Sequence, residues 1–123
     1  MRLNPDCVRA ILFAVEENTA YGKVFYYPNE YAQLSCFTQD EVKYHIKQCE
    51  LAGYLVNVEW SISSHCSIGD LHPLGHEFLA NIRKEENWEK TKSIAQKVGS
   101  YSLSSLKDIA AKVIAELIKI QVV

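Results

Sequence analysis

Few side chains in this sequence have the types and spacing that chemistry requires. His72 and His76 lie four residues apart, between Asp70 and Glu77, which would offer two imidazoles and a carboxylate to a metal ion. No H-E-x-x-H order or cysteine pair accompanies them. A histidine before a proline is also an ordinary helix cap, with the second histidine then lying against a neighbouring hairpin. We favour this structural interpretation and expect no metal and no cofactor.

A second combination, His45 and Cys49, lies in or beside the apolar stripe of an expected helix, where core packing is the ordinary explanation. A catalytic thiol needs an exposed setting that lowers its pKa, and nothing here predicts one. The glycine-rich phosphate loops, the G-x-S-x-G motif and an acidic metal cluster are also missing from the sequence. The sequence therefore does not indicate an enzyme, and no catalytic residue is assigned.

The elements around these residues begin with the segment 38–54, where helix signals agree best. Thr38 and Glu41 have the spacing of a capping box, and Gly53 follows the last turn. An apolar stripe at helical spacing should be buried: Val42, Ile46 and Cys49, with His45 and Ala52 at its margin. The opposite face carries the side chains that would read DNA: Gln39, Lys43, Tyr44 and Lys47.

The rest of the pattern predicts a mainly α chain with a small β-wing, of the α+β class. A winged helix-turn-helix should occupy residues 1–83, because a hairpin and a closing helix follow the segment above. Its other expected elements are a helix at 4–18, a strand at 23–27, a short helix at 29–34, strands at 54–60 and 66–71, and a helix at 72–83.

Residues 84–123 form a helical extension, with a charged link at 84–87 and helices expected at 88–98 and 104–121. The first of these helices should make its apolar contacts through Trp88, Ile94, Ala95 and Val98. The second carries a seam spaced four, three, four, three, as in a coiled coil: Leu106, Ala110, Val113, Leu117 and Ile120. Flanking isoleucines widen the band. It either packs on the chain's own core or joins a second copy, and its width favours a homodimer.

The length and composition of the chain are those of one globular domain. The 123 residues are 48% apolar and 23% charged, enough for a real core. No apolar run approaches the roughly 18 residues of a membrane span, and no signal peptide opens the sequence, so we expect a cytoplasmic protein without a membrane partner. Its four dispersed cysteines are expected to be small, reduced and buried: Cys7, Cys36, Cys49 and Cys66.

Charge divides the chain unevenly. Residues 1–75 hold five basic and nine acidic side chains, a net charge of −4, whereas residues 76–123 hold eight and six, a net charge of +2. Residues 48–77 contain no Lys or Arg, so the expected wing has little with which to contact phosphates. An aromatic cluster could equally be core or a different contact surface, for bases or for a protein: Tyr21, Phe25, Tyr26, Tyr27 and Tyr31.

At YHIKQCELAGYL and at GDLHPLGHEFLANI the chain resembles the uncharacterised bacterial and phage family catalogued as domain of unknown function 2513. The resemblance implies a winged-helix core and a phage or prophage origin, and it carries no activity. Cys49 and His72 replace a usual leucine and threonine. The two terminal helices are similar in layout to PadR-type repressors. The resulting hypothesis is a non-enzymatic DNA-binding transcriptional regulator; the alternative is a module that binds a host or phage protein and no DNA.

Overall fold

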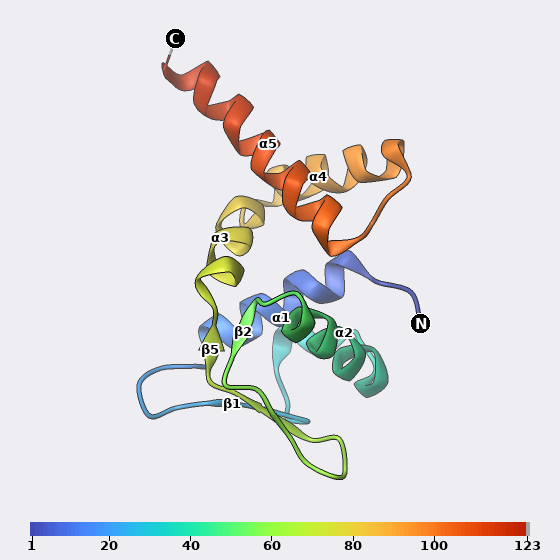
Figure 1. Ribbon diagram of the computed structural model, residues 1–123, viewed down its shortest axis with the longest axis vertical. Helices are drawn as coiled ribbons and strands as arrows, with labels where there is room; N and C mark the ends of the chain where they lie inside the picture. Colours follow the sequence, from blue (N-terminus) through green and yellow to red (C-terminus); the bar gives the residue numbers. More distant parts are fainter. Residues whose placement is uncertain (123) are drawn as a thin grey trace. The chain divides into compact units, whose positions relative to one another are not determined.

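The structure is a computed structural model that describes residues 1–122 (Figure 1). It is mainly helical, about 60%, with small antiparallel sheets, which confirms the α+β class. The elements are α1 (Pro5–Glu17), β1 (Phe25–Tyr27), η1 (a 3-10 helix, Ala32–Leu34), α2 (Gln39–Leu51), β2 (Leu55–Val56), β3 (Glu59–Trp60), β4 (Cys66–Ile68), β5 (Asp70–Leu71), α3 (Pro73–Ile82), α4 (Glu85–Val98) and α5 (Leu103–Val122).

The chain divides into two compact units, Met1–His76 and a second unit that begins at Glu77. The division falls inside α3. The boundary expected from the sequence, at residue 83, lies one residue beyond the end of that helix. No helix within residues 1–122 is both long enough and apolar enough to span a membrane.

Helix α1 begins as its sequence predicts. The backbone N–H of Asp6 donates to the side-chain oxygen of Asn4 (3.0 Å), and Pro5 occupies the first helical position, where no N–H is needed. The helix buries one continuous apolar stripe, Cys7, Val8, Ile11, Leu12, Ala14 and Val15. This stripe forms the centre of the first unit's core and contacts α2.

Helix α2 has both bonds of the predicted capping box. The N–H of Glu41 donates to Thr38 Oγ1 (3.1 Å), and the N–H of Thr38 donates to Glu41 Oε1 (3.2 Å). After the helix, Gly53 has a φ of 80°, a left-handed conformation that glycine adopts without strain. The stripe predicted for this helix is buried, which confirms the segment as its sequence describes it.

His45 lies deeper than its predicted place at the margin of the stripe, with only 1% of its surface exposed. Its Nε2 accepts a hydrogen bond from the N–H of Asn4 (2.7 Å), so the proton must lie on Nδ1, which donates to the carbonyl of Glu41 (2.6 Å). Both ring nitrogens are therefore satisfied inside the core. The imidazole connects the residue before α1 to the first turn of α2.

The sheets differ from the predicted two-stranded wing. Strands β1, β4 and β3 form one antiparallel sheet in that order, and β2 pairs separately with β5. Each of the expected strands 54–60 and 66–71 is divided, because Asn57 takes a φ of 54° and the chain turns at Gly69, whose N–H donates to the carbonyl of Val56 (3.0 Å). The hairpin thus contains an irregular step where one continuous ladder was expected.

The expected helix at 29–34 is wrong; only the single turn η1 forms. Tyr31 is extended, and its hydroxyl both donates to the carbonyl of Tyr26 (2.8 Å) and accepts from the Tyr26 N–H (3.3 Å). Its ring stacks on Phe25, with the centroids 4.5 Å apart. Because β1 is at the edge of its sheet, the hydroxyl occupies backbone groups that face outward from that edge. These tertiary contacts hold Tyr31 out of a helix.

Helix α3 starts at a histidine cap, as predicted: the N–H of Leu74 donates to His72 Nδ1 (3.1 Å). Its first turn closely approaches the backbone of Tyr54, the residue before β2. A Cβ at Gly75 would lie 2.3 Å from the carbonyl oxygen of Tyr54, so only glycine fits there. Phe78, Leu79 and Ile82 are buried, as their spacing predicts.

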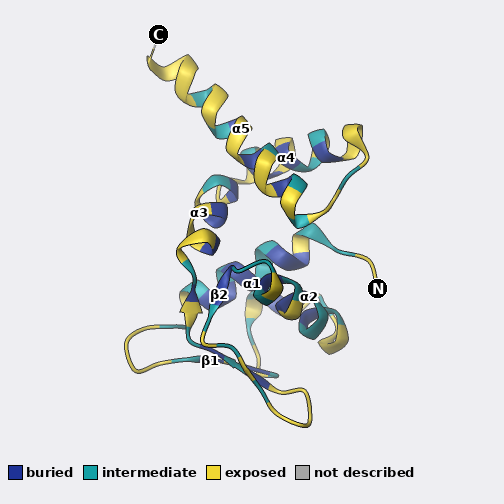
Figure 2. Cartoon of the chain, viewed as in Figure 1, coloured by how far each residue is buried: buried dark blue, intermediate teal, exposed yellow. Residues whose placement is uncertain are grey.

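In the second unit, α4 packs against α5. Helix α4 begins at Glu85, earlier than predicted, and ends at Gly99 in the left-handed conformation. The charged link expected at 84–87 is therefore mostly helical. Val98, predicted as an apolar contact, is exposed, whereas Trp88 and Ala95 are buried. Figure 2 shows the buried residues of α5 in its first turns and exposed residues toward its end.

Replacing His45 by Phe should destabilise the protein by about 1–3 kcal/mol. The ring volume stays, but the Asn4 N–H loses its acceptor and the Glu41 carbonyl loses one of its donors. Urea unfolding followed by circular dichroism measures the change. His65→Phe is the matched control, because His65 is exposed, and should change stability by less than about 0.5 kcal/mol. Equal stability of the two variants would contradict a structural role for His45.

Candidate nucleic-acid interface

The four residues predicted to contact DNA all lie on α2, but their environments differ. Gln39 and Lys47 are exposed, whereas Lys43 and Tyr44 are partly buried. The Tyr44 ring meets the His45 ring edge-on, with 5.0 Å between centroids. The positive charge of Lys43 lies near enough to Cys66 to oppose the rise of that thiol's pKa. The helix therefore brings the predicted set together, with only part of it free to reach a ligand.

Lys47 is held by two residues that the sequence did not single out. Glu50 Oε1 accepts hydrogen bonds from Lys47 Nζ (3.2 Å) and from the indole N–H of Trp60 (3.0 Å). The Lys47 ammonium also lies 5.7 Å from the centre of the Trp60 ring, within the range of a cation–π contact. We call Lys47, Glu50 and Trp60 the Glu50 cluster. It joins α2 to β3.

Two of the three residues of this cluster had a signal in the sequence. Lys47 and Glu50 stand three residues apart, a spacing that places two side chains together on a helix surface. Trp60 carries no such local signal, because its partner lies on another element. Only the packing of the hairpin beside α2 identifies it.

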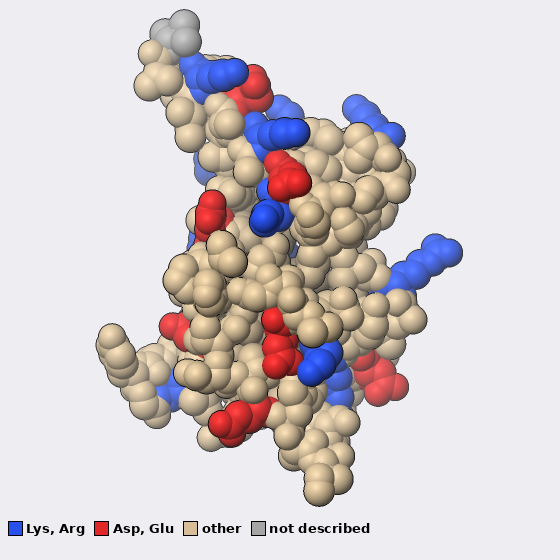
Figure 3. Space-filling view, viewed as in Figure 1, with Lys and Arg blue, Asp and Glu red and all other residues tan. Residues whose placement is uncertain are grey.

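The surface around α2 carries charges of both signs. Lys43 and Lys47 share the helix with Asp40, Glu41 and Glu50, and Figure 3 shows acidic and basic side chains interspersed there. This mixture gives no broad positive potential to attract a phosphate backbone.

The turn between β3 and β4 supplies no Lys or Arg either. Residues 61–65 are all exposed, and Ile62 is fully so at the tip. The hydroxyls of Ser61 and Ser63 bond to each other (3.0 Å), and the N–H of Ser61 donates to the carbonyl of His65 (2.8 Å). The turn therefore presents an apolar tip with hydroxyl groups beside it.

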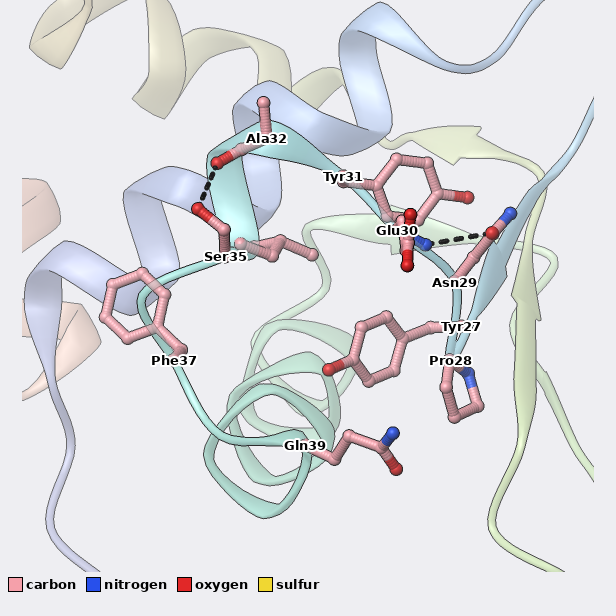
Figure 4. Close-up of a pocket in the computed structure, with 10 residues that line it drawn as sticks. Tyr27, Pro28, Asn29, Glu30, Tyr31, Ala32, Ser35, Phe37 and Gln39 are labelled. Atoms are coloured by element: carbon pink, nitrogen blue, oxygen red, sulfur yellow. Dashed lines mark hydrogen bonds between the residues drawn. The ribbon is translucent and has the colours of Figure 1, made fainter.

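A pocket of about 610 Å³ lies beside the start of α2, between the end of β1 and η1 (Figure 4). Tyr27 and Gln39 line it, and Glu30 is the one carboxylate among its described lining residues. Several of its polar groups bond within their own loop: the N–H of Glu30 donates to the Asn29 side chain (2.8 Å), and the Ser35 hydroxyl donates to the Ala32 carbonyl (2.9 Å). The pocket thus lacks the convergent acid and base expected of a catalytic site.

His72 and His76 make separate contacts and do not form one site. His72 caps α3, while His76 Nε2 lies 3.8 Å from Asp70 Oδ1, which also accepts hydrogen bonds from the Thr19 hydroxyl (3.3 Å) and the Leu71 N–H (2.7 Å). Within residues 1–122, no three or more His, Cys, Asp or Glu side chains are grouped so as to hold a metal ion.

Three cysteines are buried as expected, and their surroundings oppose ionisation. Burial raises the pKa of Cys66 to about 11 and that of Cys7 to about 12, and it also raises the pKa of Cys49. The expectation that all four are buried is wrong for Cys36, which is exposed in the turn between η1 and α2.

The five residues predicted to mediate dimerisation divide along α5. Leu106, Ala110 and Val113 are buried within the chain, in the helix that packs on α4. Leu117 is partly buried and Ile120 is 68% exposed. Ile118, one of the flanking isoleucines, is 57% exposed, and Val122 is exposed as well. The accessible apolar surface is therefore the last two turns of α5.

The model of one protein family, described as "Hypothetical protein (DUF2513)", matches residues 2–102. Because this match covers most of the chain, the protein belongs to that family, and the resemblance noted from its sequence motifs is confirmed. Neither the search of curated proteins nor the search of solved structures found a match.

The folded protein should expose one reactive thiol. At pH 8, Ellman's reagent should titrate Cys36 quickly, because the other three thiols are buried and their raised pKa values keep them protonated. In denaturant, all four should react. The Cys36→Ser variant, which should show no fast phase, is the control; rapid reaction of two or more thiols in the native protein would contradict the burial described.

Proposed function

We propose that residues 1–83 form a winged helix-turn-helix and that the protein is a DNA-binding regulator with α2 as its recognition helix. The observation that supports this most directly is the order of elements in the first unit. Helix α1 is followed by β1, the short η1, helix α2 and then a hairpin whose strand β4 pairs with β1. On α2, Gln39 and Lys47 are exposed, as are residues 61–65 of the β3–β4 turn, and groove binding requires such an accessible helix face.

The dimensions of α2 suit a major groove. Its 13 residues span about 20 Å, and the groove admits a helix of ordinary width. Gln39 and Tyr44 would supply hydrogen bonds to base edges or phosphates, and Lys43 and Lys47 would supply the positive charge. The β3–β4 turn would approach the neighbouring backbone with hydroxyl and N–H groups.

Charge limits the affinity that this interface would have. One chain offers two lysines on α2, whereas a strong DNA binder neutralises about 6 to 10 phosphates. Two α2 helices in a dimer would double the number of basic contacts. A homodimer is therefore part of this proposal.

The last turns of α5 are the surface that would join the two copies. Leu117, Ile118, Ile120 and Val122 extend the predicted seam beyond the residues that the chain itself buries. Accessible apolar side chains in one helical segment favour association with a second apolar surface. A second copy supplies such a surface automatically, by two-fold symmetry.

A second candidate function is a module that binds a host or phage protein. The Glu50 cluster favours it, because Lys47 is already paired and the same two elements carry exposed apolar side chains, Leu51 at the end of α2 and Ile62 in the β3–β4 turn. Tryptophan and large apolar side chains are typical of protein interfaces. DNA binding remains the preferred proposal because the fold order supplies a free helix and dimerisation multiplies its charge. The phage or prophage origin implied by the family resemblance stays a prediction.

DNA binding should be detectable at low salt and should depend on α2. A gel shift with DNA from upstream of the gene, at about 50 mM and 200 mM salt, should show binding that Lys43→Ala and Lys47→Ala each weaken. Lys43→Ala should make the slope of log K against log[salt] shallower by about 0.9, the value for one neutralised phosphate, and Lys47→Ala by less, because Glu50 already holds the Lys47 ammonium. Lys23→Ala is the matched control, because Lys23 is a lysine of the same unit outside α2. Absence of any shift at low salt would contradict DNA binding, and a pull-down from host lysate would then be the next measurement.

The dimer should depend on the end of α5. The wild-type chain of 14.0 kDa should sediment as a dimer at micromolar concentration, and Ile118→Lys with Ile120→Lys should convert it to a folded monomer. These positions are already exposed, so the substitutions leave the core intact, whereas a charge at Val113 would disrupt it. Ile62→Lys, at another exposed isoleucine, is the control and should still sediment as a dimer. A wild-type monomer would refute the dimer.

A further inference from the structure

A single carboxylate oxygen, Oε1 of Glu50, receives donors from two different elements. The Lys47 ammonium reaches it from the preceding turn of α2, and the Trp60 indole reaches it from β3. The two ion-paired side chains differ in exposure: 51% for Lys47 and 28% for Glu50. Lys47 can therefore leave the pair while Glu50 stays beside the indole.

This arrangement sets two forces against each other at the proposed DNA interface. A phosphate that approaches Lys47 must compete with a carboxylate 3.2 Å from the ammonium, and it also meets the negative charge of Glu50. The same carboxylate, however, fixes Trp60 against α2 and thereby limits where the hairpin can lie. The charge of Glu50 therefore weakens the binding of an anionic ligand, whereas its hold on Trp60 keeps the hairpin in place for that ligand.

We propose that Glu50 determines how strongly this interface binds nucleic acid, by restraining Lys47 while holding the β3–β4 hairpin beside α2. The inference rests on the proposed function and identifies the residue that regulates the strength of that same interface. Glu50 is a positioning residue here, since it acts through Lys47 and Trp60 and not by contacting DNA favourably.

The other acidic residues nearby lack this arrangement. Glu41 is engaged in the capping box of α2, and Glu59 precedes Trp60 on β3. The Glu59 carboxylate is exposed and makes no hydrogen bond or ion pair with residues 1–122. Glu59→Gln removes the same charge from the same region without touching the Glu50 cluster, so it is the matched control.

The experiment compares wild type, Glu50→Gln, Glu50→Ala and Glu59→Gln. Binding to a labelled 30-base-pair duplex is followed by fluorescence anisotropy over a range of salt, and elution from immobilised heparin gives a second anionic probe. Glutamine retains an acceptor for the Trp60 indole but removes the charge. Glu50→Gln should therefore bind DNA on the order of fivefold more tightly at 0.1 M salt, with a slope steeper by up to about 0.9, because Lys47 then contacts a phosphate without sharing its charge with Glu50.

The remaining variants separate charge from position. Glu50→Ala also frees Lys47 but loses the hydrogen bond to the Trp60 indole. Its DNA affinity should therefore rise less above that of wild type than the affinity of Glu50→Gln does. The DNA affinity of Glu59→Gln should rise least of the three, and its salt slope should equal that of wild type. In the free protein, NMR should show faster solvent exchange of the Trp60 indole proton in Glu50→Ala than in Glu50→Gln; equal exchange would overturn the positioning role.

The failures of the two proposals can be told apart. If wild type binds DNA and Glu50→Gln behaves as Glu59→Gln does, the role of Glu50 is overturned and DNA binding stands. If no variant binds DNA at low salt, the proposed function fails, and heparin decides the role of Glu50. Later elution of Glu50→Gln than of Glu59→Gln supports a restraint on Lys47, and equal elution overturns it.

Discussion

The hydrogen bonds of His45 hold α2 in a fixed rotation against α1, and the exposed face of α2 depends on that rotation. Apolar side chains alone would allow a helix some freedom to turn about its axis. The buried imidazole removes that freedom, because Nε2 must face the N–H of Asn4 while Nδ1 faces the carbonyl of Glu41. The side of α2 that carries Lys47 is fixed as a result. The hairpin beside it is then fixed in turn through Glu50.

Local signals in the sequence predict the helices well and the connections between them poorly. The caps at Asn4 and Thr38 are short-range features, and both are present. The short helix expected before α2 fails because Tyr31 bonds to β1, a contact between separate elements that no helical period reveals. The hairpin strands are divided by a left-handed Asn57, although asparagine only permits that conformation and does not require it.

The sequence predicts where the residues of the candidate site lie, but it does not predict which of them are accessible to a ligand. Periodicity assigns Lys43 and Lys47 to one helix, and they are found there. It cannot tell that Trp60 comes to lie beside Lys47, because that contact depends on how the hairpin packs. The same limit applies to α5, where the spacing predicts an apolar band without naming its partner. The chain buries Leu106 and Val113 itself and leaves Ile120 exposed.

The hydroxyl of Tyr31 has a consequence for how the protein can meet extended peptides. An uncovered edge strand can pair with a further strand from another chain, whether in recognition or in aggregation. At β1 a single oxygen atom opposes such pairing, because it occupies both backbone groups of Tyr26. A phenylalanine would stack on Phe25 equally well, yet it would leave the edge open. The difference between a closed and an open β1 edge therefore rests on one atom outside the core.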